Sequence, residues 1–198
     1  MLRVGITGGI GSGKTTVCEI FHHLGIPIFY ADQQAKRLYS ENSELKNQLI
    51  EHFGIETYVG PNEINLPFFK TLLASPEKRE ILNSLVHPFV FKQFDDWVNQ
   101  QKSAYIIKEA AILFESGAHK TVHKTIAVIA SENVRIERVK QRDPHRSLEE
   151  IQRIIQSQLS NEELQNRADY LILNDGSQSL IEQVRNLHQI LLNESRHF

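Results

Sequence analysis

The chain has 198 residues, with 22 basic and 24 acidic side chains, so its formal charge of −2 argues against the global positive field of proteins that bind nucleic acid or anionic membranes. This length can bury one good core, so we expect a single domain, with or without insertions. The only cysteine, Cys18, excludes an internal disulfide, and no apolar run approaches the ~20 residues of a membrane span, so we expect a cytoplasmic protein with no membrane and no nucleic-acid partner.

The first predicted strand, Leu2–Thr7, leads into the glycine-rich stretch GGIGSGKTT. Gly8, Gly13, Lys14 and Thr15 meet the pattern G-x-x-x-x-G-K-[ST]. Such a loop needs glycine because several backbone N–H groups must converge on phosphate oxygens, which side chains would obstruct. The sequence therefore predicts a phosphate-binding loop, and a glycine-rich turn without a ligand is the alternative.

A helix is predicted directly after this loop, with Gly25 as its stop signal. Four apolar residues fall on one helix face: Val17, Ile20, Phe21 and Leu24. The N-terminus of a helix favours an anion, so it suits the phosphates. Lys14 can reach the β- and γ-phosphates, and the Thr15 hydroxyl can ligate Mg²⁺.

Beyond this helix, short apolar runs alternate with longer amphipathic ones, which is typical of a parallel sheet covered by helices. The predicted strands are Leu2–Thr7, Ile26–Tyr30, Ala104–Glu109, Thr125–Ala130 and Asp169–Leu173. From Glu41 to Gln101 the sequence predicts an insertion of several helices. These helices are expected to break at Gly54, Gly60-Pro61, Pro67, Pro76 and Pro88.

Asp32 follows the end of the second predicted strand, and ligands of open α/β sheets collect at that edge. A carboxylate there could orient an alcohol, accept its proton or hold Mg²⁺ through water. Its alternative role is that of an N-cap for the next helix. Two further acids, Glu109 and Glu115, close the third apolar run, near the expected Mg²⁺ or attacking group, and either could instead be a surface charge.

The segment from 135 to 159 concentrates arginine in an otherwise acidic protein: Arg135, Arg138, Arg142, Arg146 and Arg153. Arginines on a mobile helical lid can stabilise the charge of a transferring phosphoryl group. A salt-bridged surface helix is the alternative, which we favour for Arg153, whereas Arg138 and Arg142 favour the lid.

Phosphate-binding loops serve switches, motors, transporters and kinases. A GTPase switch would ordinarily carry D-x-x-G and N-K-x-D, and a transporter ATPase an L-S-G-G-Q-like signature, and the sequence has none of them. The pattern favours a small kinase, whose chemistry is mostly positioning and charge neutralisation.

Seven stretches of the sequence occur in a characteristic order. They are TGGIGSGKT at Thr7–Thr15, Ala31-Asp32, His87-Pro88, LFE at Leu113–Glu115, RVKQRD at Arg138–Asp143, Gln158, and ADYLILNDG at Ala168–Gly176. Each beyond the first is weak alone, but together their order and spacing closely resemble the dephospho-coenzyme A kinase family over nearly the whole chain.

The resemblance implies transfer of the ATP γ-phosphate to the ribose 3′-hydroxyl of dephospho-coenzyme A, the last step of coenzyme A synthesis, with Mg²⁺. Implied catalytic residues are Asp32, Lys14, Arg142 and Arg138. Implied ATP contacts are Gly9, Ile10, Gly11, Ser12, Gly13, Lys14, Thr15, Thr16, Arg142, Asn174 and Gly176, with Thr15 also on Mg²⁺. Implied acceptor contacts are Asp32, His87, Glu109, Leu113, Phe114 and Glu115.

The resemblance also implies an α/β P-loop kinase fold with about five parallel strands. The core would comprise residues 1–32, 103–138 and 166–198, the acceptor-binding helical insertion residues 33–102, and the lid residues 139–165. The family often has D-A-D where this chain has Tyr30-Ala31-Asp32. Tyr30 replaces the first acid, so more of the catalytic role of this motif falls to Asp32. It also has Ala111-Ile112-Leu113 in place of a frequent P-L-L, which bears on loop shape.

Three alternatives stay open. Pro88 could simply begin a helix, which would leave His87 without a substrate role. A nucleoside or nucleotide kinase is the alternative within the enzymes. A regulatory protein that binds nucleotide and hydrolyses it slowly is the alternative outside them, although Asp32 and the arginine-rich lid count against it.

Overall fold

The computed structural model describes residues 1–198, which form five strands, nine α-helices and three short 3-10 helices. The chain divides into two compact units. Met1–Phe29 and Gln101–Phe198 form the first, which we call the sheet unit, and Tyr30–Gln100 forms the second, the helical unit.

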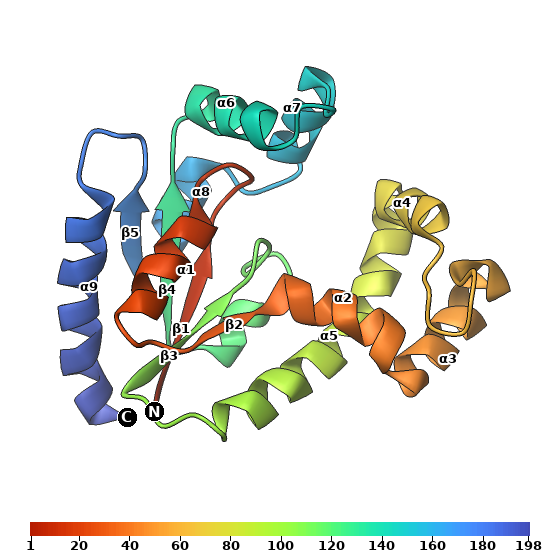
Figure 1. Cartoon of the computed structure of the whole chain (residues 1–198), viewed down its shortest axis with the longest axis horizontal. Helices are drawn as coiled ribbons and strands as arrows, with labels where there is room; N and C mark the ends of the chain where they lie inside the picture. The colour runs from red at the N-terminus through yellow and green to blue at the C-terminus, as the bar shows by residue number, and fades with distance from the viewer. The chain divides into compact units, whose positions relative to one another are not determined.

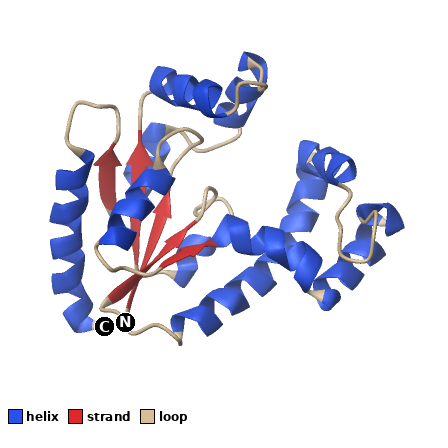
Figure 2. Cartoon of the chain, viewed as in Figure 1, coloured by secondary structure: helices blue, strands red, loops and turns tan.

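A five-stranded sheet is the centre of the sheet unit (Figure 1; Figure 2). Its strands are β1 (Leu2–Thr7), β2 (Ile28–Tyr30), β3 (Tyr105–Glu109), β4 (Lys124–Ile129) and β5 (Tyr170–Leu173). Their spatial order is β2-β3-β1-β4-β5, and β1 pairs in parallel with β3 and β4, as β4 does with β5. The predicted α/β class with about five parallel strands is confirmed.

Strand β1 lies at the middle of the sheet, in register with β3 from the Leu2–Tyr105 pair to the Ile6–Glu109 pair. Val4 and Gly5 face opposite sides of the sheet and are both buried, as expected for a parallel strand covered on both faces. The carboxyl end of β1 therefore opens between two neighbouring strands, at the edge where α/β sheets bind ligands.

Five α-helices belong to the sheet unit: α1 (Lys14–His23), α6 (Glu132–Arg142), α7 (Leu148–Gln156), α8 (Asn161–Arg167) and α9 (Leu180–Glu194). Two 3-10 helices accompany them, Ala118–Thr121 and Ser195–His197. The end of α1 is as predicted, because Gly25 follows it with a φ of 83°, a conformation that glycine adopts without strain.

The helical unit contains α2 (Ala31–Glu41), α3 (Ser43–Phe53), α4 (Leu66–Ala74), α5 (Pro76–Val98) and a 3-10 turn at Ile55–Thr57. Polar side chains cap three of these helices: Asn42, Asn65 and Ser75 each accept a hydrogen bond from a backbone N–H of the first turn. Pro67 and Pro76 stand in the first turns of α4 and α5, so the predicted boundaries at both prolines are confirmed.

The predicted break at Pro88 is wrong, because α5 continues through it. A proline inside a helix costs about 3 kcal/mol, here by removing the N–H that would reach the Ser84 carbonyl. Burial of a large apolar side chain contributes about 1.5–3 kcal/mol, and α5 buries five of them. They are Leu82, Val86, Val90, Phe94 and Val98. Packing therefore outweighs the local cost, and Figure 1 shows α5 changing direction along its length.

Strand β1 has its predicted limits, and each of the other four strands differs from its prediction by one or two residues at one or both ends. For example, β2 begins at Ile28, not at Ile26, and β4 spans Lys124–Ile129, one residue earlier than predicted. None of the helices is both long enough and apolar enough to cross a bilayer.

Candidate active site

The glycine-rich loop joins the carboxyl end of β1 to the start of α1, as the sequence predicts. Gly8, Gly11 and Gly13 have φ values of 154°, 76° and 91°, a region that favours glycine. Gly13 is the N-cap of α1, and neither a capping side chain nor an acidic residue occupies the first turn. The amides and the positive dipole end of α1 are thus available to an anion.

The space that these glycines leave open is occupied partly by the protein itself. A Cβ atom on Gly8 would collide with the Val128 carbonyl of β4, and one on Gly13 with the Asn174 side chain. The bare backbone thus serves close packing within the protein as well as the approach of phosphate.

Several polar groups of the loop have no partner within the protein. The Ser12 Oγ atom is buried without a hydrogen bond, and the N–H groups of Gly11 and Gly13 have no acceptor. A buried hydroxyl normally finds a partner, so Ser12, beside the two unused N–H groups of the half-buried glycines, favours an external acceptor. A polyphosphate oxygen cluster has the required chemistry.

Lys14 places its charge over the same loop. Its Nζ atom donates to the Gly8 carbonyl at 2.6 Å and lies 3.5 Å from the Gly9 carbonyl. The ammonium is therefore close to the backbone groups that a phosphate would approach.

Asn174 and Arg138, both predicted as site residues, meet at the loop. The Asn174 side-chain amide donates to the Ser12 carbonyl at 2.8 Å, and the Asn174 backbone N–H donates to the Ile129 carbonyl. Arg138 Nη1 in turn donates to the Asn174 carbonyl at 2.9 Å. Arg138 thus supports the loop through Asn174, and its proposed contact with phosphate stays a prediction.

Glu109 ends β3 and is almost fully buried. Burial, and then the Glu109 carboxylate, raise the pKa of the Cys18 thiol, while Lys14 opposes the rise. Glu109, Cys18 and Lys14 are therefore electrostatic neighbours below the loop. The thiol stays protonated, so Cys18 is a packing residue and not a nucleophile.

Comparison with known proteins identifies the family of the chain. The family model described as dephospho-CoA kinase matches residues 2–179. The chain belongs to the dephospho-CoA kinase family. This confirms the resemblance drawn from the sequence motifs.

Individual relatives agree with the assignment. A dephospho-CoA kinase of Salinibacter ruber is 39% identical over 181 residues, covering 89% of this chain and 90% of that protein. One of Bacteroides fragilis is 35% identical over 188 residues, covering 94% and 91%. A crystal structure of a Thermus thermophilus protein has a TM-score of 0.83 at 27% identity and covers 96% of both chains.

Of the predicted acidic and histidine contacts with the acceptor, Asp32 and His87 lie in the helical unit, whereas Glu109 and Glu115 lie in the sheet unit. Asp32 is exposed in the first turn of α2, where Tyr30 is the N-cap, so the alternative role of Asp32 as N-cap is wrong. His87 lies within α5 and stacks on Phe91, with ring centroids 5.8 Å apart. The alternative that Pro88 begins a helix is also wrong.

The LFE stretch at Leu113–Glu115 has visible packing roles. Leu113 is fully buried and reaches Gly5, and Phe114 packs in a cluster with Ala127 and Leu164. Glu115 Oε1 accepts a hydrogen bond from the Leu159 N–H at 3.4 Å. Their contact with the acceptor stays a prediction.

The remaining predicted ATP contacts are more exposed. Arg142 Nη2 lies 3.0 Å from Asp143 Oδ2, and this hydrogen bond lowers the pKa of the Asp143 carboxyl. Gly176 lies in an exposed turn in which the Ser177 N–H donates to the Asp175 side chain. Thr15 and Thr16 are exposed in the first turn of α1.

Sequence reasoning assigned no site role to two residues that contact the loop. Arg135 was noted only as part of the arginine-rich segment, yet it is buried and bonded to the loop at Ile10. Gln158, known only as a motif residue, binds the same Ile10. The spacing of Arg135 before Arg138 and Arg142 on one helical face was the available signal.

Proposed function

We propose that this enzyme transfers the γ-phosphate of ATP to the ribose 3′-hydroxyl of dephospho-CoA. The family match over residues 2–179 is the observation that carries the proposal. The unused donors around Ser12 support a polyphosphate ligand, and Asp32 is exposed, so its carboxylate is accessible to a second substrate. The partners we propose are these two small molecules, in the cytoplasm.

The loop and α1 would hold the triphosphate. Backbone N–H groups from Gly9 to Thr16 would bind phosphate oxygens, and Lys14 would neutralise the β- and γ-phosphates. Thr15 would hold Mg²⁺ together with those oxygens, because its hydroxyl is exposed in the first turn of α1. The ion would supply further charge neutralisation.

Asp32 would receive the acceptor hydroxyl. The 3′-oxygen attacks the γ-phosphorus, the bond from that phosphorus to the bridging oxygen breaks, and ADP departs with the electron pair. The hydroxyl proton passes to the Asp32 carboxylate. Arg142, in the segment 139–165 that would act as a lid, and Arg138, just before it, would stabilise the charge on the phosphoryl oxygens.

The acceptor is the decisive test of this function. We expect Mg²⁺-dependent phosphorylation of dephospho-CoA at the ribose 3′-hydroxyl, and much slower reaction with adenosine or nucleoside monophosphates. The binding energy of the long arm can be used to orient the reacting hydroxyl, so truncated acceptors should lose turnover as well as affinity. Incubation with ATP and each acceptor, followed by mass spectrometry of the products, measures this preference.

A Lys14→Ala preparation, purified in the same way, controls for contaminating kinases. Preferential phosphorylation of a nucleoside or nucleoside monophosphate would defeat the proposal and favour the nucleoside or nucleotide kinase. Hydrolysis of ATP with no phosphorylated acceptor would favour the regulatory protein.

Arg142→Ala tests the lid. Because Arg142 is exposed and bonded only to its neighbour Asp143, its loss should leave the fold intact. If it neutralises transition-state charge, kcat should fall by about 10²-fold or more while the affinity for ATP changes little. Steady-state kinetics measures both quantities. Arg185→Ala, an exposed arginine on α9, is the control, and an equal loss there would remove the special role of Arg142.

A further inference from the structure

Arg135 is the buried arginine of α6, with only 3% of its surface exposed. Buried arginines are usually paired with a carboxylate. No carboxylate lies within ion-pair distance of this guanidinium, which instead donates to neutral oxygens. Burial lowers the pKa of Arg135 and Glu132 opposes that shift. Burying the Arg135 guanidinium without a carboxylate partner costs folding free energy, which indicates a functional role for this side chain.

The contacts of Arg135 converge on one residue of the phosphate-binding loop. Arg135 Nε donates to the Ile10 carbonyl at 2.9 Å, and Nη2 lies 3.4 Å from Gln158 Oε1. The same Gln158 oxygen accepts the Ile10 N–H at 2.8 Å. The three residues therefore form a closed ring of hydrogen bonds in which both backbone polar groups of Ile10 are held.

Because of peptide geometry, the contacts that hold Ile10 also set the direction of the neighbouring Gly11 N–H. The Ile10 carbonyl and the Gly11 N–H belong to one planar, trans peptide group, so they point in opposite directions. Arg135 fixes the carbonyl, and the Gly11 N–H, which has no acceptor in the protein, is thereby aimed away from α6. A fixed donor loses less entropy when it binds a phosphate oxygen.

The packing of the flanking glycines supports the same conclusion. A Cβ atom on Gly9 would collide with the Arg135 guanidinium, and one on Gly11 with the Arg135 carbonyl. The loop therefore lies directly against Arg135 on both sides of Ile10, against its side chain at Gly9 and against its backbone at Gly11.

Gln158 connects the segment between α7 and α8 to the phosphate-binding loop. It lies between α7 and α8, where Leu159 donates to Glu115 and the Asn161 side chain donates to the Ala130 carbonyl. The end of the proposed lid segment is thus fastened beside the loop, and Gln158 is its direct contact with Ile10.

We propose that Arg135 and Gln158 are positioning residues of the nucleotide site, which hold the two peptide groups of Ile10 and so aim the Gly11 N–H at the phosphates. This inference rests on the proposed binding of ATP by the loop. Neither side chain needs to touch the substrate for this role.

Arg135→Met removes the donors but keeps an extended apolar side chain. We expect the Kd of a non-hydrolysable ATP analogue, measured by calorimetry, to rise about tenfold or more, because a hydrogen bond from a charged donor is lost. The kcat/KM for ATP should fall with it, whereas the KM for dephospho-CoA should not change. Arg135→Lys keeps the charge and a donor for Ile10, so it should recover part of the lost affinity.

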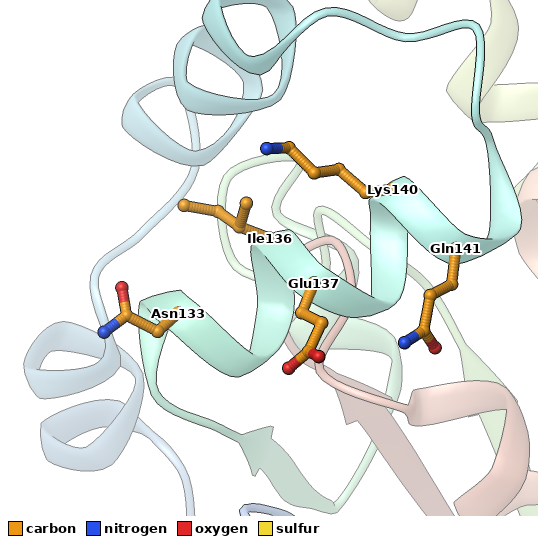
Figure 3. Close-up of a pocket in the computed structure, with 5 residues that line it drawn as sticks. All are labelled: Asn133, Ile136, Glu137, Lys140 and Gln141. Atoms are coloured by element: carbon orange, nitrogen blue, oxygen red, sulfur yellow. The ribbon is translucent and has the colours of Figure 1, made fainter.

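The matched control is Lys140→Met on the opposite face of α6. That face lines a separate surface cavity of about 420 Å³, formed by Asn133, Ile136, Glu137, Lys140 and Gln141 (Figure 3). Affinity for the analogue should be unchanged in this variant. An equal loss there would show that any substitution on α6 disturbs the loop, and would overturn the assignment to Arg135.

Gln158→Leu removes the acceptor of the Ile10 N–H, so this variant alone should also raise the Kd of the analogue, and it tests the proposal even if Arg135→Met does not fold. Because both side chains act through Ile10, the double variant should lose far less affinity than the product of the two single losses. Losses that multiply would overturn the shared role. Wild-type protein that failed to bind the analogue would defeat the proposed function itself, whereas equal binding by wild type and Arg135→Met would overturn this inference alone.

Discussion

Lys14→Ala should weaken the binding of triphosphate and slow turnover together. The Lys14 ammonium lies against the Gly8 carbonyl, over the backbone groups that would meet the phosphates. A point charge that stabilises the bound phosphates, and stabilises the transition state still more, raises Kd and lowers kcat when it is removed. We expect kcat to fall by about 10²–10³-fold, as for the loss of one preorganised group that stabilises developing charge.

Calorimetry with a non-hydrolysable ATP analogue and steady-state kinetics measure the two effects of Lys14→Ala. Lys140→Ala is a suitable control, because that lysine is exposed on the cavity-lining face of α6. Unchanged affinity together with unchanged turnover in a folded Lys14→Ala protein would contradict the assignment of the loop to ATP.

Asp32→Asn should preserve nucleotide binding and lower phosphoryl transfer by roughly 10²–10⁴-fold, the usual contribution of a positioned proton acceptor. The asparagine keeps the size and the hydrogen-bonding oxygen of the side chain but cannot take the proton. Asp32 is not the N-cap of α2, so the substitution removes no capping bond. The loss of an acid from the first turn costs about 0.3–1 kcal/mol through the helix dipole, too little to unfold the helical unit.

The acid Glu44 gives a matched control for Asp32. It occupies the first turn of α3, also in the helical unit, and is likewise exposed. Glu44→Gln should therefore reproduce the dipole effect without the kinetic one. Thermal unfolding and single-turnover phosphoryl transfer distinguish the two, and near-normal transfer by Asp32→Asn would leave Asp32 without a catalytic role.

The parts of the fold that local patterns determine were predictable. Strand β1, the loop and α1 follow one another within Leu2–His23, and each has its own local signal of apolar run, glycine spacing or helical periodicity. Pro88 shows where local reasoning fails, because the burial of a helix face far exceeds the cost of one proline.

In the candidate site, too, some residues could be predicted from the sequence and others could not. Lys14 and Asn174 belong to recognisable motifs, and the structure brings Asn174 to the loop. The role of Arg135 could not be predicted, because its partner Ile10 lies 125 residues earlier in the chain. Neither residue type suggests the pairing, which depends on how β4 and α6 return to β1 in the folded sheet.

The packing around the loop glycines has a consequence for judging related sequences. Val128, Arg135 and Asn174 occupy the space beside Gly8, Gly11 and Gly13, so these glycines serve the packing of the protein itself. A descendant that had lost catalysis would still be under selection to keep these glycines, simply in order to fold. The glycine spacing is therefore a poor criterion for separating active enzymes from pseudoenzymes. Ser12 and Lys14 are better ones, because the Ser12 hydroxyl satisfies no group of the protein and Lys14 supplies the charge that phosphates require.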